Sequence, residues 1–153
     1  LNSGIALKRR IIEDLRPSSL SNLGLLPALE ILGSEFAERA GLAVHMKLTP
    51  GIGLDAGAQL TAYRMVQEAL TNIAKYAQAG AVEISLALDG PMALLTVQDD
   101  GIGFDAAQAS GRSAHGLTGM RYRVESEGGM FEIDAAPGRG TRLSAWLPRR
   151  DPA

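Results

Sequence analysis

The chain has 153 residues, of which 46% are hydrophobic and 21% charged, and its formal net charge is −2. This composition is typical of one globular domain with a hydrophobic core, and the slight negative charge argues against a domain that neutralises nucleic-acid phosphates. Because cysteine is absent, disulfides and thiolate metal sites are excluded. No apolar run is long enough to cross a bilayer, and the start LNSGIALKRR has the wrong charge order for a signal peptide. We therefore expect contact with neither nucleic acid nor membrane.

The first part of the chain predicts helices. Apolar residues recur at helical spacing over residues 1–15, and Pro17 ends this helix. The segment SSLSN, residues 18–22, is expected to be a loop. A second helix is predicted over residues 23–41, ended by Gly41.

The middle of the chain alternates strands with one long helix. Residues 43–49 have the alternating pattern of a strand, and residues 58–79 form the longest helical pattern, ended near Gly80. The strands 81–88 and 92–98 are joined by Asp89-Gly90, a hairpin signal.

The last part predicts a small helix between strands. Residues 105–116 are small and polar and predict a mobile loop. A short helix over 117–129 is followed by strands at 130–136 and 141–148. This order favours an α+β domain with one helix layer on one face of a mixed, mostly antiparallel sheet.

The helix at 58–79 has two faces. Val66, Leu70, Ile73 and Ala77 share one face and predict core, while Arg64, Glu68, Asn72 and Lys75 share the opposite face. That polar face could be a solvated network of weak surface pairs. It could also serve phosphoryl transfer: the Asn72 carbonyl suits Mg²⁺, Glu68 could act on a nucleophile, and Lys75 could meet a phosphate.

The stretch TVQDDGIGFDAA, residues 96–107, ends a strand on two carboxylates. Alternation places Asp99 on the same face as Leu95 and Val97, so its carboxylate should point into the core. A buried carboxylate needs donors, such as the exocyclic amino group of adenine, and Gly101 and Gly103 would allow close backbone approach. The alternative is a strand-end turn in which Asp99 is a local cap.

Two further glycine-rich stretches allow similar alternatives. Gly116-Leu117-Thr118-Gly119 precedes the predicted short helix, whose free N–H groups could attract phosphate, or it is only a turn. GRGT, residues 138–141, precedes the last strand, where Thr141 shares a face with core residues. Neither a Walker loop nor a dinucleotide fingerprint is present.

Taken in order, QEALTNIAKYAQA, DDGIGF, HGLTGMRYRVESEGG and GRGTRLSAWLP resemble the N, G1/F, G2 and final GxGT boxes of the ATP-binding domain of sensor histidine kinases. This family shares its fold with gyrase, Hsp90 and MutL. The lead-in LKRRIIEDLRPSSLSNLGLLPALE is similar to the end of the dimerisation and phosphoacceptor domain of the nitrate-sensor and DesK-like branch. The resemblance implies a Bergerat ATP-binding fold, a two-layer α/β sandwich, over residues 17–150, with residues 1–16 ending the helical domain.

The resemblance also implies residue roles. Asp99 would bind the adenine amino group, assisted by Thr141, in a pocket shaped by Gly101 and Gly103. Asn72 would ligate Mg²⁺, and Glu68 would be the general base for the attacking imidazole. The remaining phosphate and lid residues implied by the family are Lys75, His115, Gly116, Leu117, Gly119 and Arg121.

Three departures from the family pattern stand out. Tyr76 occupies a position where the family often has His, and Asp100 replaces the commoner Asn. The phosphoacceptor His, which the family carries in an upstream helix before an acidic residue, is missing, because His45 lies in a predicted strand and His115 in the predicted lid. We therefore expect ATP binding without an acceptor of its own.

The implied function is transfer of the ATP γ-phosphoryl to a His on a neighbouring helical domain, for relay to a response regulator. Homodimerisation through that helical domain and a cytoplasmic location are implied as well, with a parent protein that could be membrane-anchored. The alternatives are an ATP-dependent conformational clamp of the gyrase or Hsp90 type, or a degenerate module that regulates by binding alone.

Overall fold

The computed structural model describes residues 17–103 and 112–150, with residues 112–115 described by their backbone alone. The helices are α2 (Ser18–Leu23), α3 (Leu25–Ala40), α4 (Ala56–Asn72), the π-helix η1 (Ile73–Ala77) and α5 (Arg112–Ser126). The strands are β1 (Ala43–Leu48), β2 (Ala81–Asp89), β3 (Met92–Asp99), β4 (Met130–Ala135) and β5 (Thr141–Pro148). None of the described helices is both long and apolar enough to span a membrane.

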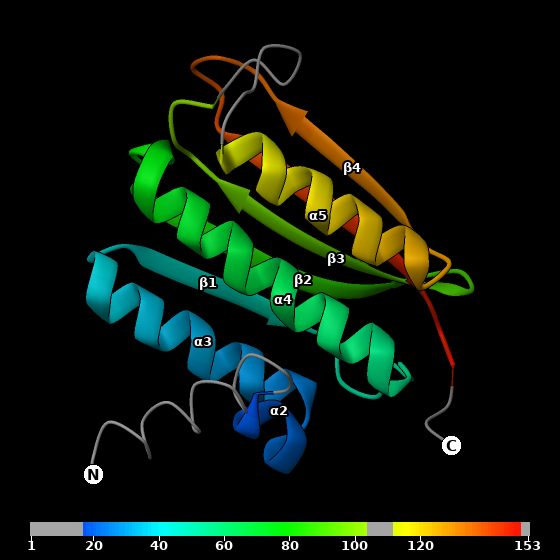
Figure 1. Cartoon of the computed structure of the whole chain (residues 1–153). Helices are drawn as coiled ribbons and strands as arrows, with labels where there is room; N and C mark the ends of the chain where they lie inside the picture. Colours follow the sequence, from blue (N-terminus) through cyan, green and yellow to red (C-terminus); the bar gives the residue numbers. More distant parts are fainter. Residues whose placement is uncertain (1–16, 104–111, 151–153) are drawn as a thin grey trace, which may run out of the picture.

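One five-stranded sheet organises the domain, with strand order β1-β2-β3-β5-β4. β1 runs parallel to β2, and every other neighbouring pair is antiparallel. Helices α3, α4 and α5 lie side by side over one face of this sheet (Figure 1). The predicted α+β architecture, one helix layer on a mixed and mostly antiparallel sheet, is confirmed.

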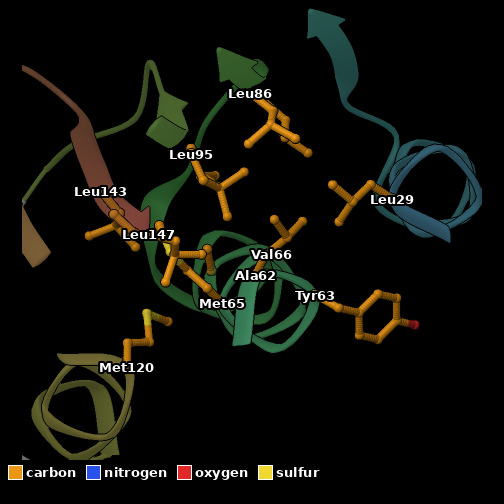
Figure 2. Close-up of a cluster of buried hydrophobic side chains, with 14 of the residues drawn as sticks. Leu29, Ala62, Tyr63, Met65, Val66, Leu86, Leu95, Met120, Leu143 and Leu147 are labelled. Atoms are coloured by element: carbon orange, nitrogen blue, oxygen red, sulfur yellow. The ribbon is translucent and has the colours of Figure 1, made fainter. Parts of the chain in front are cut away.

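The core lies between helix α4 and the sheet (Figure 2). Alternation along β3 turns Ala93, Leu95 and Val97 toward the helices, and each is at most 2% exposed. Of the predicted apolar face, Val66, Leu70 and Ile73 are at most 6% exposed, whereas Ala77, in η1, is half-buried. Core side chains drawn from all layers are Leu29, Ala62, Tyr63, Met65, Val66, Leu86, Leu95, Met120, Leu143 and Leu147. Helix α4 is therefore held on the sheet by its apolar face, and its polar face does not take part in the core.

The loop predicted at residues 18–22 is wrong, because these residues form helix α2. Leu20 is 2% exposed, and burying this side chain stabilises a short helical turn that propensity alone does not favour. Gly24, with a φ of 90°, then separates α2 from α3. The helix predicted over residues 1–15 lies outside the described residues.

The helix predicted over residues 58–79 differs at both ends. It begins at Ala56, where Asp55 accepts a hydrogen bond from the N–H of Ala58 at 2.8 Å and caps the first turn. After Asn72 the helix widens into the π-helix η1, a local form often found at functional sites. The left-handed Gln78, with a φ of 51°, follows η1, so the helix ends before Gly80.

The short helix predicted from residue 117 begins earlier, at Arg112. Leu117, Met120 and Val124 lie on one face of α5 and are at most 8% exposed. Their burial anchors the helix on the core, and its first turns extend back through residues expected to be loop. The rest of the predicted mobile loop, residues 105–111, lies outside the described residues.

Candidate functional site

Asp99 is the last residue of β3, where it pairs with Thr141 of β5 and Val82 of β2. It lies on the helix-facing side of the sheet and is 5% exposed, as alternation predicted. One carboxylate oxygen, Oδ1, accepts the N–H of Gly101 at 2.8 Å. Neither ion pair found in the described parts of the chain involves Asp99. A buried carboxylate without a basic partner is costly, and it therefore favours a hydrogen-bond donor brought by a ligand.

Burial raises the pKa of the Asp99 carboxyl above its ordinary value, because desolvation disfavours the charged form. The nearby charge of Asp100 adds to the rise, while hydrogen bonds from the backbone N–H groups of Gly101 and Thr141 oppose it. The hydrogen bond from Gly101, two residues on, is the local turn cap that the sequence also allowed. Burial nevertheless distinguishes Asp99 from an ordinary surface turn residue. Because perturbed carboxyls gather at functional sites, its raised pKa is consistent with a binding role.

Asp100 is adjacent in sequence but exposed, and its carboxylate turns the other way, toward the start of β2. Its Oδ1 accepts the N–H of Gly80 at 2.8 Å and that of Ala81 at 3.0 Å. These two hydrogen bonds lower the pKa of the Asp100 carboxyl, and the one from Ala81 has the larger effect. Two neighbouring carboxyls thus have opposite electrostatic environments.

The glycines that follow occupy crowded positions. A Cβ atom on Gly101 would overlap the carbonyl of Ala77 at the end of η1. Gly103 has a φ of 67°, and a Cβ there would overlap the carbonyl of Ala136 in the β4–β5 turn. Between the two glycines, the N–H of Ile102 donates to the Ala77 carbonyl at 2.7 Å. The loop 99–103 is therefore held between η1 on one side and the β4–β5 turn on the other.

Thr141 opens β5 directly opposite Asp99. It is half-buried, and the alternate residues beyond it, Leu143 and Ala145, are at most 5% exposed. Thr141 therefore lies on the helix-facing side of the sheet, beside Asp99, as the strand pattern predicted.

The polar face of α4 meets helix α5. Glu68 and Asn72 are half-buried. A Cβ atom on Gly116 would lie 2.5 Å from Glu68 Oε1 and 3.6 Å from Asn72 Nδ2. A larger residue at position 116 would displace the Glu68 carboxylate, the flexible end of that side chain, whereas contact with Asn72 would be ordinary. The structure brings Glu68, Asn72 and Gly116 together, while Lys75 is exposed on η1.

The alternative of a surface network joining Glu68, Asn72 and Lys75 is not found. Among the described side chains, no hydrogen bond or ion pair links these three to one another. Their neighbour Arg64 instead donates to Gln67 at 2.8 Å. The expected pairing of Glu68, Asn72 and Lys75 with one another is therefore not what holds this face of α4.

The glycine-rich stretch 116–119 does not precede a helix, and this prediction is wrong. Gly116, Leu117 and Gly119 lie inside α5, whose N–H groups beyond the first turn are used within the helix. Leu117 is 8% exposed and belongs to the core. His115 lies in the same helix, among the four residues described by their backbone alone.

Arg121 is engaged elsewhere. Its guanidinium Nη1 donates to the carbonyl of Phe131 at 2.9 Å, and Cζ lies 5.3 Å from the centroid of the Phe131 ring. In this structure Arg121 therefore ties α5 to β4.

Two features of the site were missed from sequence. The first is the π-helix, for which residues 73–77 carry no signal. The second is the contact of Asp100 with Gly80 and Ala81. The predicted turn at Asp89-Gly90 is one residue off, because Asp89 pairs with Met92 and the two turn residues are Gly90 and Pro91. With that register, residue 99 lies opposite residue 82, and Asp100 lies near the start of β2.

No group of three or more His, Asp or Glu side chains able to hold a metal ion occurs in residues 17–103 and 112–150. Asn72 offers a single oxygen beside Glu68. Such a donor set suits Mg²⁺ that arrives with nucleotide phosphates and keeps several waters, and it does not suit an ion caged by protein ligands.

Comparison with known proteins agrees with this geometry. The profile described as "Histidine kinase-, DNA gyrase B-, and HSP90-like ATPase" matches residues 57–151. The chain is 38% identical over 152 residues to the sensor histidine kinase MctS of Rhizobium johnstonii, covering 97% of this chain and 33% of that protein. It is 35% identical over 144 residues to the oxygen sensor histidine kinase NreB of Staphylococcus carnosus, covering 94% of this chain and 42% of that protein. The chain thus spans between a third and a half of these relatives.

A solved structure supports the fold. The histidine kinase AdeS of Acinetobacter baumannii superposes with a TM-score of 0.67 at 16% identity, over 96% of this chain and 81% of that one. At this identity the likeness concerns the fold alone. With the profile match over most of the chain and the histidine kinases among its relatives, the chain belongs to the histidine kinase-, DNA gyrase B- and HSP90-like ATPase family, as predicted from its motifs.

Proposed function

We propose that this chain is the ATP-binding catalytic domain of a sensor histidine kinase, which transfers the γ-phosphoryl of ATP to a His on a helical domain. Residues 17–150 form the catalytic domain, and residues 1–16 end the helical domain. A response regulator receives the phosphoryl group, and the full-length protein is a homodimer through its helical domain. The domain works in the cytoplasm. The names of the curated relatives favour this function over a gyrase-type or Hsp90-type clamp.

The observation that carries the proposal is the environment of Asp99. Asp99 is 5% exposed as a residue, and its carboxylate forms no ion pair in the described chain. The exocyclic amino group of adenine would donate to this carboxylate, and Thr141, opposite on β5, would assist. Gly101 and Gly103 shape this end of the site, because larger residues would displace its walls. Asp99 is desolvated and needs an N–H donor from the ligand. The site should therefore discriminate strongly against bases that lack such an N–H group.

The phosphate end of the site lies on α4. Asn72 would hold the metal of a Mg²⁺–ATP complex, and that ion supplies charge neutralisation for the phosphates. Glu68, four residues earlier on the same helix face, would accept the proton of the attacking imidazole. Lys75 and His115 would lie near the phosphates.

Helix α5 forms the cover of this end. Gly116 lies against Glu68, so the first turns of α5 occupy space beside the proposed general base. In this proposal the first turns of α5, including Gly116, Leu117 and Gly119, would move relative to α4 to admit the acceptor His. Arg121 would reach a phosphate only after leaving the Phe131 carbonyl.

Nucleotide titration tests the function. Wild-type protein should bind ATP and ADP with micromolar affinity. Asp99→Asn should weaken binding by about a hundredfold, because Asn has only one oxygen, and while that oxygen accepts from Gly101 its NH2 group would face the adenine amino group. Isothermal titration with and without Mg²⁺ measures both. Thr96→Ser on the opposite face of β3 is the control that should bind normally. Equal affinity of wild type and Asp99→Asn for ATP would remove the adenine assignment, and no binding by the wild type would favour a degenerate module.

A further inference from the structure

Asp100 lies where the phosphate half and the adenine half of the proposed site are connected. The residues proposed for metal and phosphate lie on α4 and η1, whereas Asp99 lies at the end of β3. The chain connecting the first half to the sheet is the short segment 77–81, between η1 and β2. Whatever fixes this segment also fixes the distance between the two halves.

Backbone atoms provide two of the contacts that hold segment 77–81. The carbonyl of Ala77 accepts the N–H of Ile102 at 2.7 Å, and the carbonyl of Ala81 accepts the N–H of Asp100 at 3.3 Å. Both contacts join segment 77–81 to the loop 99–103. They use only carbonyl groups of the segment and leave its N–H groups to other partners.

The N–H groups of Gly80 and Ala81 are satisfied by one side chain. Asp100 Oδ1 accepts from both, at 2.8 Å and 3.0 Å. Gln78, in the same segment, has a left-handed φ of 51°, so the chain turns sharply between η1 and β2. A charged acceptor bound to two successive N–H groups is a strong and directional restraint on such a turn.

From this geometry we infer that Asp100 is a positioning residue for nucleotide binding: it fixes the end of η1 against the loop that carries Asp99, and so sets the spacing between the phosphate and adenine halves of the site. The inference rests on the proposed function. Asp100 itself points away from Asp99, toward Gly80 and Ala81, and contacts no reacting atom.

Two substitutions of Asp100 separate the role of its oxygen from the role of its charge. An asparagine retains Oδ1 as an acceptor for both N–H groups and removes only the charge, whereas alanine removes the acceptor. Asp100→Asn should therefore preserve the positioning effect, and Asp100→Ala should abolish it. The raised pKa of Asp99 gives a second reason for Asp100→Asn to bind well, because that variant removes a repulsive neighbouring charge.

The experiment measures the affinity of the full chain for Mg²⁺–ADP by calorimetry in wild type, Asp100→Ala, Asp100→Asn and Asp55→Ala. Asp55 is the matched control, since its Oδ1 also accepts a backbone N–H at 2.8 Å, from Ala58, but at the opposite end of α4. We expect Asp100→Ala to weaken binding about tenfold, as misplacement of binding groups does. Asp100→Asn and Asp55→Ala should stay within about twofold of wild type.

Amide hydrogen exchange without nucleotide provides an independent readout. Gly80 and Ala81 should lose protection in Asp100→Ala and keep it in Asp100→Asn and Asp55→Ala. Normal Mg²⁺–ADP affinity in Asp100→Ala would overturn the positioning role while leaving the proposed function intact, and so would equal losses in the Ala and Asn variants. Failure of the wild type to bind nucleotide would instead overturn the proposed function, and the positioning role with it.

Discussion

The two ends of helix α4 are built differently. At its start, the helix is regular and its first turn is capped by Asp55, which also approaches Arg150 with its other oxygen at 3.4 Å. At its end, the helix widens into η1, the chain turns through Gln78, and loop 99–103 packs against the last turn. The regular end follows local rules of capping. The irregular end departs from them, and it is there that η1 meets the loop that follows Asp99.

This contrast indicates a division of labour within one helix. The start of α4 stabilises the domain, and its end positions polar groups at some expense in regularity. Substitutions at the two ends should therefore affect different measurements, stability at one and nucleotide chemistry at the other.

The largest expected effect is on transfer, at the irregular end. Glu68→Ala should bind ATP normally but transfer phosphate to a separately supplied helical acceptor domain about 10² to 10⁴ times more slowly, since a general base is lost. Radiolabelled phosphotransfer assays measure the rate, and Glu30→Ala on the exposed side of α3 is the control. Unchanged transfer would reduce Glu68 to a residue that only contacts α5.

Gly101→Ala tests how tightly the irregular end is packed. Its new Cβ would overlap the Ala77 carbonyl, so the variant should lose about 1–3 kcal/mol of unfolding free energy. Urea denaturation measures this loss. Gly119→Ala is the contrasting variant: no atom lies within 4 Å of its Cβ, and it should gain up to about 1 kcal/mol because alanine favours helix. A stable Gly101→Ala protein would contradict the close packing of loop 99–103.

Asp55→Ala tests the regular end. Removing the cap should lower the unfolding free energy by about 1 kcal/mol, with the affinity for ADP unchanged. Arg150→Ala separates the cap from the ion pair, whose two side chains are 60% and 34% exposed and which should contribute less than about 0.5 kcal/mol. If Asp55→Ala weakened ADP binding as much as Asp100→Ala, the division between the two ends would be wrong.

The smallest expected effects concern pH. The pKa of Asp100 is lowered in the fold, so its contribution to stability is present above the ordinary aspartate pKa of 3.8 and is lost as pH falls through its folded pKa. The pKa of Asp99 is raised, so its contribution is present below 3.8 and is lost as pH rises through its folded pKa. Urea denaturation between about pH 2.5 and pH 6 measures both.

The two Asn variants separate these contributions. Asp100→Asn should flatten the stability profile on the acid side, and Asp99→Asn should flatten it on the side above the ordinary aspartate pKa. Identical profiles in the two variants would show that the two carboxyls do not have opposite environments.

Much of the fold could be predicted from sequence, because local pattern and burial agree along most of the chain. The apolar stripe of Val66, Leu70 and Ile73 and the alternation that turns Asp99 inward both follow from simple periodicity. The hairpin between β2 and β3 was also predicted, although its turn residues are Gly90 and Pro91 and Asp89 still pairs with Met92.

The features that could not be predicted depend on tertiary contacts. The early start of α5 at Arg112 relies on burial of Leu117 and Met120 against the core, which no local signal reports. Helix α2 depends in the same way on burial of Leu20. The sequence of residues 73–77 fits an ordinary α-helix and gives no sign of the π-helix. Its last residue, Ala77, contacts loop 99–103, which is distant in sequence.

The grip of two backbone segments on loop 99–103 has a consequence for inhibitor design. Under the proposed function, a small heterocycle at the adenine end would lie against loop 99–103, whose position is fixed by contacts with Ala77 and Ala136. A compound that mimics the triphosphate would instead lie beside Glu68 and α5, so its affinity would also depend on the position of that helix. Fragment screening against the base end is therefore the more robust starting point.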